Sequence, residues 1–218
     1  MRQDDQQSMP DLWRMVGCAT CGSFYLDPRP TRDSLGKAYE DHYTHQMDAG
    51  DPATAGDTIV SRTVNGYLNR RFGMRLQPAS RMGGYLFGAL PPLRMKLDVF
   101  GRHVPRHLCE ARGRLLDVGC GNGAFVARAT SMGLVAKGSD PDPKAVAAGR
   151  QKGLEILEGD VFSAHWNAAR FDWITMNHVI EHVEAPRQVI ARAFELLAPG
   201  GHLWLGLPNP GALGARWL

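Results

Sequence analysis

The stretch Leu115–Ala124 constrains the fold of this chain more than any other. It runs from a short apolar segment through Asp117 into a turn that contains Gly119, Gly121 and Gly123. This order predicts a strand, a tight loop and the start of a helix, which together open a nucleotide-binding βαβ unit. Glycines leave no Cβ atoms to hold a ligand away from the loop backbone. The carboxylate before the first glycine favours a cationic ligand over a pyrophosphate.

From Arg114 onward, patterns typical of strands alternate with patterns typical of helices. The predicted strands are Leu115–Val118, Leu134–Ser139, Leu154–Leu157, Phe171–Met176 and His202–Leu207. The predicted helices are Ala124–Met132, Pro143–Lys152 and Pro186–Leu197. Residues Pro199–Gly201 are predicted to form a turn. This alternation predicts an α/β fold, a Rossmann-like open, mostly parallel sheet with helices on both faces.

Polar residues follow the predicted strands at the edge where parallel strands end and ligands gather. Asp140 follows the second strand, about 20 residues after the glycine loop, which is the distance at which an acid meets ribose hydroxyls. A carboxylate can accept hydrogen bonds from both of those hydroxyls. Asp160 follows the third strand and could accept from an adenine amino group, with Val161 or Phe162 against the ring.

The first half of the chain has a different organisation. A small β module with strands Leu12–Val16 and Phe24–Leu26 precedes a short helix, Thr31–Tyr43, and a loop at 48–57. Helical spacing with basic faces marks Thr58–Phe72 and Leu93–Glu110, which Gly83–Pro92 separates. We therefore predict three regions: a knuckle-like module at 1–47, a basic helical linker or lid at 48–110, and a ligand-binding core at 111–218.

The segment from Thr58 to Arg114 is strongly basic. It holds eleven Lys and Arg residues against two acids, although the whole chain carries a net charge of only +3. Such a segment suggests an anionic substrate, a nucleic acid or a membrane surface as partner, and a solvated helix face is the plainer alternative. We find no signal peptide and no apolar run of about 18 residues, so we expect a cytoplasmic protein without a spanning helix.

Four cysteines are too few for a dense disulfide framework. Cys18 and Cys21 are spaced like half of a zinc knuckle, and a structural zinc site needs four ligands. His42 and His45 could complete a set of two cysteines and two histidines. The alternative is a pair of reduced thiols in a β-hairpin.

Several motifs in the second half of the chain carry a family resemblance. They are Leu116–Gly123, Gly138–Pro141, Glu158–Val161, Phe171–Ile174, Val179–Val183 and Leu197–Gly201. Through them, residues 114–209 resemble class I S-adenosylmethionine-dependent methyltransferases of the small-molecule type. The cysteine pair and residues 25–30 resemble the N-terminal knuckle of methyltransferases that act in surface-glycan or secondary-metabolite pathways.

The resemblance implies S-adenosylmethionine as cofactor and a part for each polar residue at the strand ends. It assigns the methionine end of the cofactor to the loop residues Gly119, Cys120, Gly121 and Gly123. It assigns the ribose to Asp140 and Pro141, the adenine to Asp160 and Val161, and a further contact to Asn177. Asp117 suits the ammonium and sulfonium charges of this cofactor, whereas a nicotinamide cofactor would place an anion on the loop.

A histidine–carboxylate group follows the fourth predicted strand. An oxygen nucleophile must lose its proton during methyl transfer, and His178, Glu181 and His182 are the candidates to accept it. If a helix begins there, the spacing of four places both histidines on one face. The resemblance to quinone-pathway O-methyltransferases implies a similar Glu-His pair, sometimes with a metal. Asn177 stands where such enzymes carry another acid, which argues against a metal here. The alternative is that the pair only anchors a helix start.

These observations favour methylation of an oxygen or carbon atom of a small molecule such as a sugar, a lipid or a quinone. A non-catalytic cofactor-binding remnant and a nucleic-acid methyltransferase are the alternatives. The second lacks the aromatic-proline signature after the fourth strand, where this chain has Asn177–Ile180. The family's sheet has seven strands, and this chain ends at Leu218 after the fifth, so we expect a C-terminally truncated core. The oligomeric state is not predicted.

Overall fold

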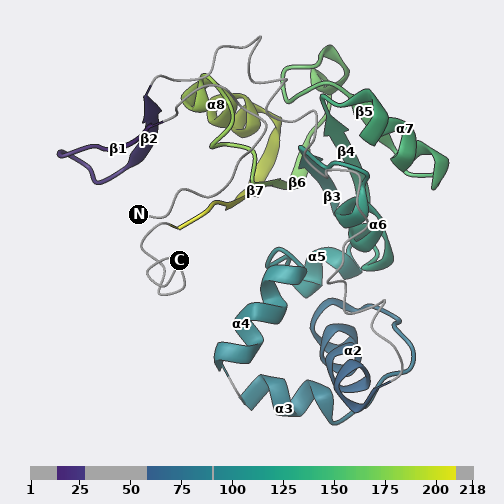
Figure 1. The fold of residues 1–218 in the computed structure, drawn as a ribbon. Helices are drawn as coiled ribbons and strands as arrows, with labels where there is room; N and C mark the ends of the chain where they lie inside the picture. The colour runs from purple at the N-terminus through teal and green to yellow at the C-terminus, as the bar shows by residue number, and fades with distance from the viewer. Residues whose placement is uncertain (1–13, 28–57, 90, 210–218) are drawn as a thin grey trace. The chain divides into compact units, whose positions relative to one another are not determined.

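The computed structural model describes residues 14–27, 58–89 and 91–209 (Figure 1). The chain divides into two compact units, Met1–Thr44 and His45–Leu218. The predicted helix Thr31–Tyr43 and the loop at 48–57 lie outside the described residues, as do His42 and His45. The predicted boundaries at 47 and 110 stay predictions.

The described part of the first unit is a β-hairpin. Strands β1 (Arg14–Gly17) and β2 (Phe24–Asp27) pair antiparallel, with Met15 opposite Leu26. At the turn, the backbone N–H of Cys18 donates to the carbonyl of Ser23 over 2.8 Å. The small N-terminal sheet that the sequence predicts is therefore confirmed.

The second unit is built on a five-stranded parallel sheet with the order β5-β4-β3-β6-β7. Its strands are β3 (Arg114–Val118), β4 (Val135–Asp140), β5 (Ile156–Glu158), β6 (Phe171–Asn177) and β7 (Leu197–Gly206). The chain moves outward from β3 to β5 and then returns to the other side of β3 with β6. This reversal places the end of β3 at a topological switch point, where open α/β sheets bind ligands.

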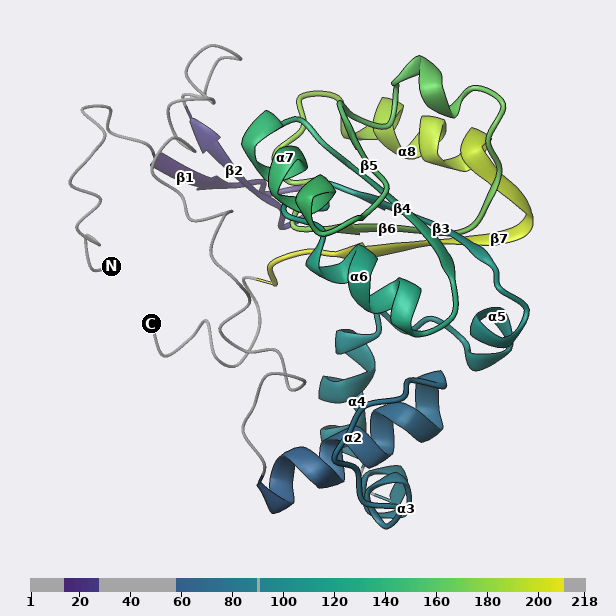
Figure 2. The same cartoon turned by 90° about the vertical axis from the view of Figure 1, so that its right-hand side faces the viewer.

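Helices cover both faces of this sheet, as the sequence predicts. They are α6 (Ala124–Ser131), α7 (Pro143–Gln151) and α8 (Pro186–Leu196), and a short 3₁₀ helix spans Ala164–Trp166. Figure 2 shows α6 and α8 on opposite sides of the strands. The cause is the alternation within each strand: Leu115 packs with α6, and Leu116 packs with α8 in a separate cluster. Both leucines are fully buried, so the sheet is apolar on both faces.

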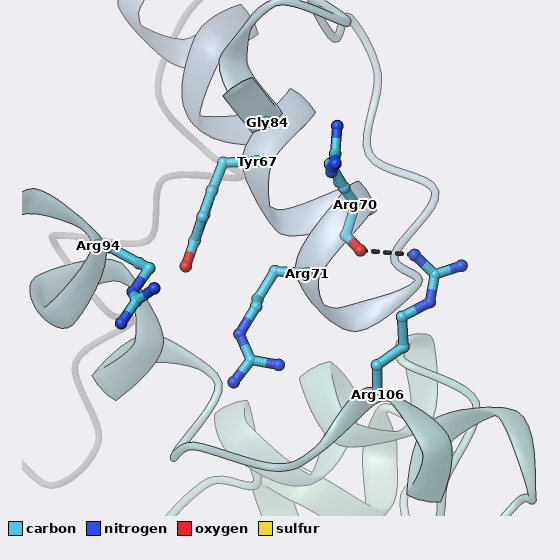
Figure 3. A pocket seen from close by; sticks show the side chains of 6 residues that line it. All are labelled: Tyr67, Arg70, Arg71, Gly84, Arg94 and Arg106. Atoms are coloured by element: carbon cyan, nitrogen blue, oxygen red, sulfur yellow. Dashed lines mark hydrogen bonds between the residues drawn. The ribbon is translucent and has the colours of Figure 1, made fainter. Parts of the chain in front are cut away.

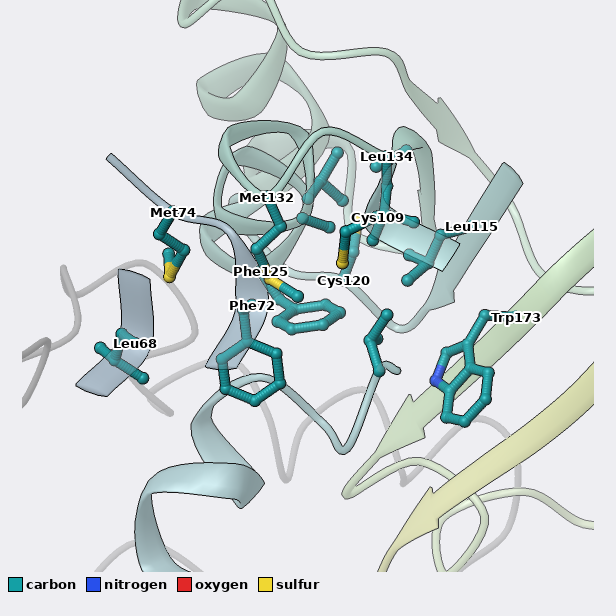
Figure 4. Packing of buried hydrophobic residues seen from close by; sticks show 14 of the residues in the cluster. Leu68, Phe72, Met74, Cys109, Leu115, Cys120, Phe125, Met132, Leu134 and Trp173 are labelled. Carbon is teal, nitrogen blue, oxygen red and sulfur yellow. The ribbon is translucent and has the colours of Figure 1, made fainter. Parts of the chain in front are cut away.

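The described residues of the basic segment fold into four helices, and side chains of these helices pack in the cluster that contains Leu115. They are α2 (Ile59–Phe72), α3 (Gly83–Ala89), α4 (Pro91–Phe100) and α5 (Arg106–Glu110). Figure 4 shows Leu68 and Phe72 of α2 in the same cluster as Phe125 and Leu115. Phe72 is fully buried, so this helical segment shares its core with the sheet.

The close crossing of α2 and the start of α3 depends on two glycines. A Cβ atom at Gly66 would stand 1.8 Å from the carbonyl oxygen of Ser80. A Cβ atom at Gly83 would stand 1.9 Å from the carbonyl oxygen of Thr63. Since both obstacles are backbone atoms, neither position accepts a side chain without separation of the two segments.

The structure corrects three local predictions. The helix predicted over Leu93–Glu110 is two helices, α4 and α5, because Arg102 and His103 adopt φ angles of 46° and 54° that end the first. The separator predicted at Gly83–Pro92 contains α3 and the first turn of α4. Pro199–Gly201 lies within β7, where the register with β6 jumps, so these residues form an irregularity in a strand.

The strand and helix boundaries otherwise agree with prediction to within a few residues. Thr58 caps α2 as its side chain accepts from the backbone of Ser61 over 3.0 Å. Asp142 caps α7, with Pro143 at its first turn. In the part of the chain that the structure describes, no helix combines the length and the apolar character needed to cross a membrane.

Candidate functional site

The glycine loop follows β3 at the switch point of the sheet. The backbone N–H groups of Gly119 and Cys120 both donate to the carbonyl of Ser139, over 2.8 and 3.0 Å, which ties the loop to the end of β4. Gly119 and Gly123 have φ angles of 67° and 80°, which favour glycine. A Cβ atom at Gly119 would stand 2.4 Å from Val179, and one at Gly123 would stand 2.4 Å from Ile156. Packing against these two side chains, together with the positive φ angles, therefore requires glycine at both positions.

Asp140 joins this loop from the end of β4. One carboxylate oxygen accepts from the backbone N–H of Gly121 over 2.7 Å, and the other accepts from Asp142 over 2.9 Å. Both donors hold the carboxylate in one orientation beside the loop, and each oxygen of a carboxylate can accept more than one hydrogen bond. The structure thus brings together Gly121 and Asp140, which are 19 residues apart in the sequence. Pro141, also predicted for the cofactor site, is exposed next to them.

The carboxylate of Asp117 lies before the glycine loop and is paired with the guanidinium of Arg102. The Asp117 side chain is fully buried and forms an ion pair with the Arg102 guanidinium. The Thr175 hydroxyl donates to the same carboxylate oxygen, Oδ1, over 2.8 Å and accepts from Arg102 over 2.9 Å. The other oxygen, Oδ2, is buried with no hydrogen-bond partner among the described residues. Burial raises the pKa of the Asp117 carboxyl above its ordinary value, and the positive charge of Arg102 opposes that shift.

Arg102 is the site residue that sequence reasoning missed. Its side chain is 13% exposed, and its guanidinium lies 3.8 Å from the centre of the Phe125 ring and 5.6 Å from that of Trp204. No motif marks it, because it lies in the break between α4 and α5 and meets Asp117 only in the folded chain. The one local signal is that the predicted helix there contains Gly101.

The two residues predicted for adenine differ in their surroundings. The carboxylate of Asp160 is exposed and accepts from the backbone N–H of Phe162 over 2.8 Å. The side chain of Val161 is buried in the core beneath α8, so it cannot lie against a bound ring. Phe162 is 47% exposed and is the better candidate for that contact.

Cys120 contributes only its backbone to the loop surface. Its side chain is buried, and a Cβ atom added at Gly138 would stand 2.6 Å from its sulfur. Burial raises the pKa of this thiol far above its ordinary value, and the charges of Asp117 and Asp140 add to the shift. The thiol is therefore neutral at physiological pH and is not a nucleophile.

The predicted proton acceptors lie just beyond the end of β6. His178 is exposed, and its Nδ1 atom lies 3.1 Å from a carboxylate oxygen of Glu181. Its φ angle of 53° is unusual for a residue with a side chain, and its backbone N–H donates to the carbonyl of Gly206 over 2.9 Å. Strained residues of this kind concentrate at functional sites. Asn177 precedes it, and the Asn177 side-chain oxygen would stand 2.5 Å from a Cβ atom added at Gly206.

His182 is placed differently from the prediction. Residues 178–185 form turns, and α8 begins only at Pro186, so no helix face carries the two histidines. His182 Nε2 lies 3.9 Å from the Glu181 oxygen that also faces His178. Glu181 therefore stands between two imidazoles, and the closer contact is to His178.

The predicted metal pair lies in the hairpin of the first unit. The thiol of Cys21 is exposed and donates to the Ser23 hydroxyl over 3.3 Å, and hydrogen bonds with Ser23 lower its pKa. Among residues 14–27, 58–89 and 91–209, no three His, Cys, Asp or Glu side chains gather in a way that could hold a metal ion. The described residues thus do not fit a zinc site, and His42 and His45 lie outside them.

Comparison with known proteins places the chain in a family. A family described as a methyltransferase domain matches residues 93–217, which is more than half of the chain. The chain therefore belongs to the methyltransferase domain family. This confirms the class of protein that the glycine loop and the parallel sheet indicate.

Particular relatives are similar to about half of the chain. A ubiquinone biosynthesis O-methyltransferase from Nitrosococcus oceani is 32% identical over 54% of this chain and 50% of the relative. One with the same name from Xanthomonas oryzae pv. oryzae is 34% identical over 56% and 51%. The chain spans about half the length of these curated relatives. A solved methyltransferase from Thermotoga maritima, described as a possible histamine N-methyltransferase, is 21% identical at a TM-score of 0.42 and covers 61% of this chain and 65% of that one.

Proposed function

We propose that this chain binds S-adenosylmethionine and transfers a methyl group to an oxygen atom of a small, quinone-like molecule. The observation that carries the proposal is the hydrogen bond from Gly121 to Asp140, because it joins a glycine-rich loop to an oriented carboxylate. The names of the curated relatives support oxygen as the acceptor atom and a quinone-like acceptor. A cytoplasmic location remains a prediction.

The residues present fit this cofactor. The glycine-rich loop after β3 and the Asp140 carboxylate that is oriented beside it are features that a bound ligand would explain. Asp140 would hold the ribose through its carboxylate, and Asp160 with Phe162 would hold the adenine. Because Arg102 covers Asp117, we assign Asp117 to the positioning of Arg102, whose guanidinium is suited to the carboxylate of the cofactor. When bound, the cofactor supplies the methyl group as part of a sulfonium.

The chain itself handles the proton of the acceptor. If the Nδ1–H of His178 donates to Glu181, the imidazole carries its lone pair on Nε2. Nε2 can then take the proton from an acceptor hydroxyl, and the Glu181 carboxylate stabilises the resulting imidazolium. Glu181 thus orients the base, and His178 performs the proton transfer.

Calorimetric titration of the chain with S-adenosylhomocysteine, with NAD as control, tests the cofactor. We expect saturable binding of the first and none of the second. Binding of NAD alone would contradict the proposal. Turnover with a catechol, compared with a sugar and an RNA oligonucleotide, then tests the acceptor. Methylation of the oligonucleotide in preference to the catechol would favour a nucleic-acid methyltransferase. Cofactor binding without turnover of any acceptor would favour a non-catalytic protein.

A further inference from the structure

The helical segment contains a cavity whose lining is cationic. Its volume is about 330 Å³, and it is bordered by Tyr67, Arg70, Arg71, Gly84, Arg94 and Arg106 (Figure 3). Four of these six residues are arginines, and they come from α2, α4 and α5. Among residues 14–27, 58–89 and 91–209, no acidic side chain borders the cavity. The residues assigned above to the cofactor and the acceptor do not border it either, so it is a separate feature of the unit.

Two of these arginines, Arg71 and Arg94, keep hydrogen-bond donors that the nearby carboxylate of Asp98 does not accept. Asp98 lies behind the wall, where it accepts from Arg71 Nε over 3.1 Å and from the Tyr67 hydroxyl over 2.6 Å. Arg94 Nε lies 3.9 Å from the same carboxylate. In the part of the chain that the structure describes, no protein acceptor takes a hydrogen bond from the terminal Nη atoms of Arg71 or Arg94. Both ends are therefore available to a ligand.

The remaining two arginines are held by other contacts. Arg106 donates from Nε to Glu110 over 2.8 Å and from one Nη atom to the carbonyl of Arg70 over 2.6 Å. The guanidinium of Arg70 lies 4.2 Å from the centre of the Tyr85 ring. Four guanidinium groups thus share two carboxylates, and about two positive charges stay uncompensated by these partners.

The walls of the cavity are fixed by packing. Gly84 leaves room for Arg70, since a Cβ atom at that position would stand 2.5 Å from the Arg70 Cδ atom. The glycine crossing at Gly66 and Gly83 joins α2 to the start of α3, and the buried hydrogen bond between Tyr67 and Asp98 joins α2 to α4. The arginine side chains consequently project from a scaffold that cannot easily separate to relieve their mutual repulsion.

We propose that this cavity binds a phosphoryl group, as a monoester or a diphosphate, at a site separate from the methyl-transfer site. Guanidinium groups pair with phosphate oxygens through two parallel hydrogen bonds. A phosphoryl group offers more charge and more oxygen atoms than a single carboxylate, and donors from three helices match several oxygens. The alternative is that the arginines only tie the helices together, as Arg106 does at the last turn of α2.

Titration of the full chain with inorganic pyrophosphate separates these two accounts. We expect saturable binding that weakens about tenfold or more in Arg94→Gln and in Arg106→Gln. Arg75→Gln is the matched control, because Arg75 is exposed in the same segment and does not border the cavity. It removes the same charge and should leave pyrophosphate affinity nearly unchanged. Circular dichroism melts of all variants check folding, and Arg94 is the safer change since its carboxylate contact is long.

Absence of saturable pyrophosphate binding, or equal weakening in all three variants, would overturn the proposal. Vesicle sedimentation then identifies the source of the phosphoryl group. Binding to phosphatidate vesicles but not to phosphatidylcholine vesicles, with competition by pyrophosphate, would support a lipid headgroup. Pyrophosphate binding without vesicle binding would support a soluble phosphorylated molecule.

Discussion

Removal of Arg102 should destabilise the chain in a way that depends on pH. Asp117 is fully buried, and Arg102 is its only cationic partner among the described residues. In Arg102→Met the carboxylate keeps one donor, the Thr175 hydroxyl at 2.8 Å. Loss of one partner from a buried ion pair costs about 3–5 kcal/mol, because the other charge stays buried without compensation. We expect a loss of this size in the free energy of unfolding near neutral pH.

The pH dependence follows from the direction of the pKa shift. The pKa of Asp117 is already raised by burial, and the loss of Arg102 removes the charge that opposes this shift. A carboxyl whose pKa is higher in the folded than in the unfolded state makes folding less favourable as pH rises between the two values. The deficit of Arg102→Met should therefore be larger at about pH 8 than at about pH 5, because it shrinks as falling pH favours the protonated form of Asp117.

Urea denaturation followed by circular dichroism at both pH values measures this effect. The double variant Asp117→Asn/Arg102→Met is the control, because it has no buried carboxylate at this position. It should be more stable than Arg102→Met at the higher pH, and the difference should narrow as pH falls. A loss below about 1 kcal/mol in Arg102→Met, or a loss that is equal at both pH values, would refute the reasoning.

Four further changes test the candidate site and the packing of α2. Asp140→Asn should weaken S-adenosylhomocysteine binding about tenfold to a hundredfold in calorimetry, because charge-assisted hydrogen bonds to the ribose are lost; unchanged affinity would exclude Asp140 from the site. His178→Ala should lower kcat about a hundredfold or more while cofactor affinity stays nearly constant, and turnover equal to that of the unchanged chain would exclude His178 as the base. Glu181→Gln should shift the pH profile of kcat. Gly66→Ala, which would stabilise an isolated helix by about 1 kcal/mol, should instead lower the thermal midpoint, since its Cβ atom would stand 1.8 Å from a backbone oxygen.

Much of the geometry of the candidate cofactor site could be predicted because its signals are local. The loop after β3 needs glycine at fixed positions, and the carboxylate of Asp140 follows β4 at the spacing of a βαβ unit. The prediction for Val161 shows the limit of this reasoning. The sequence places the residue at the end of the third strand, but only the packing beneath α8 shows that its side chain points into the core.

The proposed proton acceptors show the same division between local and long-range signals. The order Asn177 to His182 indicates a polar turn after the fourth strand, and the structure does bring His178 within 3.1 Å of Glu181. The helical spacing suggested for the two histidines was wrong, because His178 adopts a positive φ angle and the helix starts later. The spacing of four between the two histidines fits a helix, but it fits a non-helical turn before Pro186 equally well.

The sequence by itself determined the parallel sheet, its covering helices and the glycine loop, because apolar periodicity and glycine positions act over a few residues. Tertiary structure decided what the buried charges contact. Asp117 and Arg102 are 15 residues apart, and Tyr67 and Asp98 are 31 apart, and neither pair has a periodic signal. Only the folded chain could show that an arginine compensates the loop's acid, and that four other arginines surround one cavity, because long-range contacts depend on how complete elements pack.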